Sequence, residues 1–263
     1  MTDNEKFLLE KLKNENMESL TKKGRKAELE KYCSWIGVPK SGSAKEKASR
    51  LLYWYDSKTY KDRLEKYENL KLKIDVKPGL FHGKTVRKNI SQNLWLKKIR
   101  LEILSKYDFK CSICGYKPVE SERKQLHVHE IESYDIENGI CELKGLELIC
   151  RFCHSFHHIA RTYSIATKAQ MEELISHFTK INEIGREEYH DYFRLLKHAW
   201  RNESDNAIKS NVKYDPHKKV RFKISFDIPY RDQVIEQLKK KDLYENNGGL
   251  EQPLEQEEKL SMT

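Results

Sequence analysis

Apolar residues recur every three or four positions along most of this chain, which predicts a mainly helical protein. The first well-defined helix is predicted over residues 25–35. The glycine-containing segment 37–42 ends it, and a capping box formed by Ser43 and Glu46 begins the next helix. The heavily charged residues 56–75 are predicted to form either one further helix or a linker.

Two short segments follow the alternating pattern of a β-strand instead. Leu126 and Val128 point to one side of the first segment, and His127 and His129 point to the other. Residues 220–226 alternate in the same way. The pattern therefore predicts an α+β protein that is mostly helical and has few strands.

The chain after residue 165 again has apolar stripes at helical spacing. Residues 168–183 and 186–200 are predicted to form a helical hairpin that packs on the preceding segment. The strand at 220–226 leads into a helix that ends at Leu243, and the polar tail is predicted to be disordered. The predicted domains are 1–75, 76–165 and 166–243, followed by a tail at 244–263.

The charge of the chain is unevenly distributed. Of its 263 residues, the first 110 contain 27 Lys and Arg against 15 Asp and Glu, whereas the rest contain 23 against 26. No acidic residue occurs from Val76 to Leu101. This basic excess predicts a polyanionic partner, because neutralising phosphates releases counterions. The positions expected to contact it are Lys84, Arg87, Lys88, Lys97, Lys98 and Arg100.

The apolar segments are short. None approaches the ~20 residues that cross a bilayer, and the N-terminal residues lack the apolar stretch of a signal peptide. We therefore expect a cytoplasmic protein with no membrane partner. Its thiols then stay reduced, which favours metal binding over disulfides.

Two Cys-x-x-Cys pairs, with 35 residues between them, have the spacing of two half-sites for one metal ion. Four thiolates form a closed tetrahedral site, which predicts a structural zinc ion. The four ligands are Cys111, Cys114, Cys150 and Cys153. Cys33 and Cys141 have no partner at ligand spacing.

Histidines supply a second set of metal donors. His154 and His158 are spaced i and i+4, so a helix places them on one face. With His129 on the predicted strand they would build an open site for a second divalent ion, which could be Mg²⁺, Mn²⁺, Ni²⁺ or Zn²⁺. The remaining helical histidines are interpreted as surface or interface residues, namely His177, His190 and His198.

The order of these motifs resembles the HNH, or ββα-metal, endonuclease family. The resemblance covers roughly residues 95 to 165 and is carried by Cys111-Ser-Ile-Cys114, Leu126-His-Val-His-Glu-Ile131 and Leu148-Ile-Cys-Arg-Phe-Cys-His-Ser-Phe-His-His158. It implies a ββα-metal module and a metal-dependent endonuclease that hydrolyses DNA. The implied catalytic residues are His129 as a metal ligand and Glu130 as the general base or a further ligand.

Some positions depart from the family pattern. Gly145 stands where the family has its central Asn. A gapless match gives His129 the ligand position and Glu130 that of the base, whereas a shift by one makes His129 the base and leaves Val128 at the ligand position. The chain is more similar to a sub-group with His-Glu-aliphatic followed by Tyr-Asp, here Tyr134-Asp135. His127 and His157 are alternative proton acceptors.

Residues 19–55 resemble a SAP-type DNA-binding module, and an ordinary helical hairpin is the alternative. A non-catalytic zinc-stabilised DNA-binding protein is the main rival to a nuclease. It would bind one zinc ion, whereas the nuclease would bind a second ion as well. An RNA-directed nuclease, or a subunit whose partner supplies targeting, is a further alternative. One site of this kind cuts one strand, so double-strand cleavage would need a homodimer or two visits.

Overall fold

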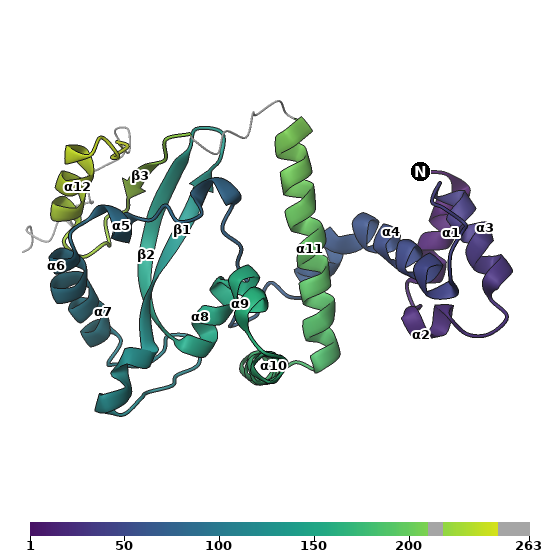
Figure 1. Ribbon diagram of the computed structural model, residues 1–263, viewed down its shortest axis with the longest axis horizontal. Coiled ribbons are helices and arrows are strands. Elements are labelled where there is room, and N and C mark those ends of the chain that lie inside the picture. Colours follow the sequence, from purple (N-terminus) through teal and green to yellow (C-terminus); the bar gives the residue numbers. More distant parts are fainter. Residues whose placement is uncertain (210–217, 247–263) are drawn as a thin grey trace, which may run out of the picture. The chain divides into compact units, whose positions relative to one another are not determined.

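The computed structural model describes residues 1–209 and 218–246, with side chains described up to residue 201 in the first range. The fold is α+β and mostly helical, as predicted, and contains one three-stranded sheet (Figure 1). The described residues fall into two compact units. One comprises Met1–Leu70 with the described part of Gly185–Ser210, and the other comprises Lys71–Ile184 with the described residues after 217.

The first unit is entirely helical. Its elements are α1 (Asp3–Leu12), α2 (Met17–Leu20), α3 (Lys26–Trp35), α4 (Ala44–Glu65) and α11 (Arg186–Lys209). The predicted capping box at Ser43 and Glu46 is confirmed, and the helix that it begins continues unbroken to Glu65. The first half of the charged segment, residues 56–65, is therefore the end of this long helix. A core of buried leucines joins the first four helices: Leu8, Leu12, Leu20, Leu29 and Leu51.

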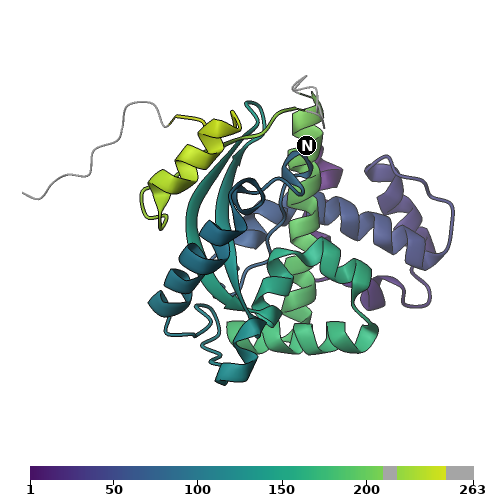
Figure 2. The ribbon, with the colours of Figure 1, turned by 60° about the vertical axis from the view of Figure 1, so that its left-hand side comes forward.

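The second unit is built on a long antiparallel hairpin of β1 (Leu126–Asp135) and β2 (Ile140–Cys150). The short strand β3 (Arg221–Ile224) adds to β2 in parallel, which gives the order β1-β2-β3. Figure 2 shows the hairpin with α12 (Arg231–Lys240) beside the end where β3 pairs. Both predicted strands are confirmed, and the first extends six residues beyond His129.

Helices flank this hairpin. Before it come the 3₁₀ turn η1 (Gly79–Phe81), α5 (Val86–Asn89), α6 (Gln92–Leu94), the π-helical turn η2 (Trp95–Ile99), α7 (Arg100–Lys106) and the 3₁₀ segment η3 (Glu120–Gln125). After it come α8 (Arg151–His157), α9 (Ile159–Ile165) and α10 (Lys168–Asn182). Figure 1 shows α7 on one side of the hairpin and α8 on the other. None of the described helices combines the length and apolar character that crossing a membrane requires.

The two faces of β1 differ as the alternation predicts. Leu126 and Val128 are buried, with 1% and 8% of their surface exposed, whereas His127 and His129 are only partly buried. His127 stacks on His154 of α8, so the histidine face of β1 faces that helix. Hence the hairpin places its apolar face on one helical layer and its histidines opposite another.

The two predicted helices of residues 168–183 and 186–200 both form, as α10 and α11. The helix α10 belongs to the second unit, whereas α11 packs along α4 in the first. The physical reason is a buried carboxylate, Asp56, which is only 1% exposed. Arg63 donates to it over 2.7 Å, and Arg194 of α11 also pairs with it. A charge so buried needs such partners, and α11 supplies one of them.

The first residues of the predicted tail, 244–246, are described by the structure and contact the sheet. The backbone N–H of Phe222 donates to Leu243, and that of Glu245 donates to Phe222, so Tyr244 forms a parallel bridge with the short strand. The prediction for residues 247–263 lies outside the described part of the chain. Residues 244 and 245 therefore extend the sheet beside the short strand.

Candidate functional site

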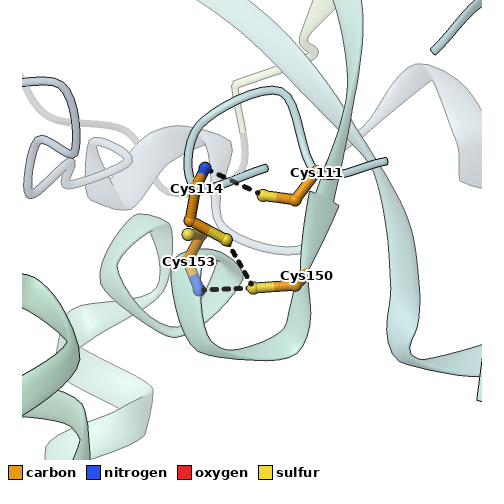
Figure 3. A group of neighbouring side chains, drawn as sticks. All are labelled: Cys111, Cys114, Cys150 and Cys153. Carbon is orange, nitrogen blue, oxygen red and sulfur yellow. Dashed lines mark hydrogen bonds between the residues drawn. The ribbon is translucent and has the colours of Figure 1, made fainter. Parts of the chain in front are cut away.

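The four cysteines of the two pairs come together at one end of the hairpin (Figure 3). Cys111 and Cys114 lie on the loop after α7, Cys150 ends β2, and Cys153 lies in the first turn of α8. Their sulfur atoms all lie within 4.8 Å of one another. The side chain of Cys150 also caps α8, because its sulfur accepts the N–H of Cys153 at 3.5 Å. The cluster thus joins loop, strand and helix.

The sulfur geometry fits a tetrahedral zinc ion. Two Zn–S bonds of about 2.3 Å at the tetrahedral angle place their sulfurs about 3.8 Å apart. The sulfurs of Cys114 and Cys150 are 3.7 Å apart, whereas a disulfide would bring them to about 2.05 Å. The N–H of Cys114 donates to the sulfur of Cys111 at 3.5 Å, which stabilises a thiolate. These four residues could therefore hold a metal ion such as zinc.

His177 on α10 contacts this cluster, which sequence reasoning did not foresee. Its Nε2 atom lies 3.3 Å from the sulfur of Cys153, and its ring packs 5.3 Å from that of Phe152. A donor at this position supports the thiolate without coordinating the ion. By contrast, His190 and His198 both belong to the first unit. His190 is exposed, whereas His198 is buried with its Nε2 atom 3.8 Å from the carboxylate of Asp56.

His129, His154 and His158 form a second group, with ligand atoms within 4.8 Å of one another. Because α8 follows β2 directly, its first turns bring His154 against the neighbouring strand β1. The Nε2 atoms of His154 and His158 are 3.1 Å apart. Two metal–nitrogen bonds of about 2.1 Å that meet at roughly 95° would span this distance. The donor atoms therefore fit one divalent ion with positions left open.

These histidines are held neutral. Burial, with the neighbouring histidines, lowers the pKa of His129 to about 2 and that of His154 to about 3. Burial likewise lowers the pKa of His158. Neutral imidazole has a free lone pair, which is the form that binds metals. The group is thus prepared to coordinate an ion at neutral pH.

Glu130 lies elsewhere. Glu130 pairs with Leu146 across the hairpin. Its side chain lies on the apolar face of β1, so it points away from the face that carries His129. Its Oε1 atom accepts the backbone N–H of Arg87 at 3.1 Å. Burial, together with the nearby Glu132, raises its pKa to about 7. Among the described residues, neither group of donors that includes His129 contains Glu130.

A cavity of about 190 Å³ opens beside His154, lined by basic and aromatic groups. The basic side chains are Arg87, Arg100 and Lys124, and none of the lining residues is acidic. Arg100 donates to the carbonyl of Leu126 at 3.2 Å. Burial, and then the like charge of Arg87, lowers the pKa of Arg100. An anion in this cavity would relieve both effects.

The π-helical turn η2 shapes this cavity. Its backbone closes a bond from the N–H of Arg100 to the carbonyl of Trp95, five residues earlier. Trp95 and Arg100, the two residues that this wider turn joins, both line the cavity, and the guanidinium of Arg87 lies over the Trp95 ring, 5.4 Å from its centroid. Trp95 belongs to the core, because only 3% of its surface is exposed.

Of the six basic residues predicted to contact a polyanion, only Arg87 and Arg100 line this cavity. Lys84 donates to the carbonyl of Lys218, and Lys98 donates to Gln233, each over 3.1 Å. Lys88 and Lys97 are exposed. Lys124 was not among the predicted contacts, because it lies in η3, outside the acid-free segment from Val76 to Leu101. Its place just before a histidine-bearing strand was the available signal.

No protein-family model, curated protein or solved structure matches this chain.

Proposed function

We propose that this chain is a metal-dependent endonuclease that hydrolyses phosphodiester bonds in DNA. The observation that carries the proposal is the convergence of three neutral imidazoles beside a cationic cavity. A strand of the hairpin and the helix after it present His129, His154 and His158, and the cavity begins at His154. The cysteine cluster would hold the end of the hairpin and the start of that helix together.

The ion would be held by His129, His154 and His158. When bound, a divalent ion supplies charge stabilisation at phosphorus and at the leaving oxygen. The chain itself supplies positioning. Arg87 and Arg100 would hold a backbone phosphate beside the ion, since guanidinium groups match phosphate oxygens in pairs. Lys124 adds a third positive charge to the same cavity.

His127 is the better candidate to accept the proton of the attacking water. Its ring stacks on that of His154, with centroids 4.7 Å apart and planes 4° from parallel, and it lines the cavity. Burial, and then Arg100, lowers its pKa, so it is neutral and can accept a proton at pH 7. Glu130 would instead fix the backbone of Arg87, and so act as a positioning residue.

The helical first unit would add DNA affinity. Its helices α3 and α4 follow the order of a SAP-type module, and an extended glycine-containing loop joins them. Gly42 adopts a φ of +99°, and a side chain there would meet the Glu46 carboxylate at 2.7 Å. That loop therefore requires glycine to close the capping box of α4.

A plasmid-nicking assay tests the proposal. Purified protein is incubated with supercoiled DNA in EDTA, Mg²⁺, Mn²⁺ or Ni²⁺, beside His154→Ala and the matched control His190→Ala. We expect metal-dependent nicking that is lost in His154→Ala and retained in His190→Ala, because His190 is exposed in the other unit. Equal nicking by both variants would refute the assigned site.

The same assay separates the two candidate bases. His127→Ala should lower the nicking rate by about 10² to 10⁴, the usual contribution of a general base. Glu130→Gln keeps an acceptor for the Arg87 N–H and should lower it much less. A large loss in Glu130→Gln with full activity in His127→Ala would return the role to Glu130.

A non-catalytic zinc-stabilised DNA-binding protein is the second candidate. The cysteine cluster and the cationic cavity favour it equally, because neither requires a second ion. Salt-sensitive DNA binding without nicking in any ion would support this alternative.

A further inference from the structure

His157 presents a problem that the proposed function does not solve. Both of its ring nitrogens are buried, and neither has a hydrogen-bond partner in the described protein. A neutral imidazole has one donor and one acceptor, and burying either of them without a partner is destabilising. The ring lies on α8 between His154 and His158, but it is not part of the group that they form with His129.

Glu147 presents a similar problem on β2. It lies directly opposite His129 in the hairpin register, so the two side chains share a face of the sheet. Its carboxylate accepts a hydrogen bond from the Ser112 hydroxyl at 3.0 Å. No Lys or Arg forms an ion pair with it within the described ranges. Burial raises its pKa, as expected for a carboxylate that lacks a cation.

These two groups meet at His129. The ring centroids of His129 and His157 are 4.3 Å apart, and the ligand atoms of His129, His157 and Glu147 all lie within 4.8 Å of one another. Two imidazoles and a carboxylate are a common donor set for divalent transition metals. One cation at this point would pair with the carboxylate and satisfy a nitrogen of His157.

We propose that His129, Glu147 and His157 form an alternative divalent-cation site, which shares His129 with the group of His129, His154 and His158. It has an oxygen donor that the three-histidine group lacks, so it favours harder ions such as Mn²⁺. The proposal concerns metal binding alone and holds whether or not the chain cuts nucleic acid.

The experiment removes the first site and asks whether a cation still binds. In the double variant His154→Ala/His158→Ala only His129 remains of the three-histidine group. Full-length protein with its cysteine-bound zinc is dialysed against Mn²⁺, and both metals are then counted by mass spectrometry. We expect the double variant to keep about one Mn²⁺ per chain, and adding Glu147→Gln to weaken that binding by at least about tenfold.

A matched control uses the same strand and the same substitution. Glu142→Gln in the double variant should keep its Mn²⁺, because Glu142 is paired with Lys144 at 2.7 Å and belongs to neither donor group. Unchanged zinc content and melting temperature show that each variant is folded. A folded double variant that binds no Mn²⁺, or one whose Mn²⁺ survives Glu147→Gln, would overturn the proposal. Nicking is measured separately, so failure of the nuclease proposal gives a different result.

Discussion

Replacing Cys150 with serine should unfold the sheet-containing unit. Cys150 ends β2, lies 3.7 Å from the sulfur of Cys114 and caps α8 through the N–H of Cys153. Serine offers a neutral hydroxyl in place of a thiolate, so the closed four-sulfur site loses one ligand and its affinity for zinc. The perturbation therefore acts where loop, strand and helix meet.

The magnitude follows from the role of a structural zinc. Its apparent binding free energy is about 10–16 kcal/mol in small zinc domains, and this is folding free energy. A typical domain is stable by only about 5–15 kcal/mol, so losing even half of the zinc contribution removes most of that margin. Serine keeps the helix cap, because its hydroxyl can accept the N–H of Cys153, so the expected loss comes from the zinc ligand alone.

Cys141→Ser is the matched control, since it makes the same change on the same strand. Cys141 is fully buried but lies outside the cluster, so burying a hydroxyl there should cost about 1–3 kcal/mol and leave zinc bound. Zinc content is measured with a chromogenic chelator, and unfolding by circular dichroism. If Cys150→Ser kept its zinc and melted within a few degrees of the parent protein, the structural role of the cluster would be wrong.

Three further predictions concern charge. Arg100→Met should weaken DNA binding and reduce the magnitude of the slope of log K against log salt by about one. Lys97→Met removes an exposed side chain and should change this slope less. Equal slopes in the two variants would argue against phosphate binding in the cavity. Asp56→Ala should destabilise the helical unit by about 1–3 kcal/mol in urea unfolding, because Arg63 and Arg194 lose the buried carboxylate that they share and, among the described residues, keep only Asp191 as an acidic partner. A change below about 0.5 kcal/mol would contradict this. Hydrogen bonds from Arg25 lower the pKa of Glu15 below 4.5 in the folded protein. The ionised Glu15 therefore stabilises the fold above pH 4.5, and this contribution is lost as the pH falls through the pKa of Glu15 in the folded protein. Arg25→Gln should therefore flatten the acid limb of a stability–pH curve, and an unchanged curve would refute the coupling.

Local spacing in the sequence predicted much of the site. The two Cys-x-x-Cys pairs, the i, i+4 spacing of His154 and His158, and the alternation around His129 are each short-range patterns. Such patterns depend only on the periods of helices and strands, so they can be recognised without knowledge of the fold. The capping box of Ser43 and Glu46 could be predicted for the same reason.

Longer-range relations could not be predicted in this way. Matching Glu130 to a motif gave it the role of base, but the pleat of β1 places it on the face opposite His129. The hairpin register decides that Glu147 lies opposite His129, and the wider turn at Trp95 decides that Arg100 lines the cavity.

The sequence by itself determined which residues carry metal-binding chemistry and which elements hold them. Only the tertiary structure decided which of these residues meet, and it assigned α11 to the first unit through the buried Asp56. The physical reason is that periodicity sets the direction of a side chain relative to its own backbone. Its partners, in contrast, depend on strand register, helix packing and the need of each buried charge for a counter-charge.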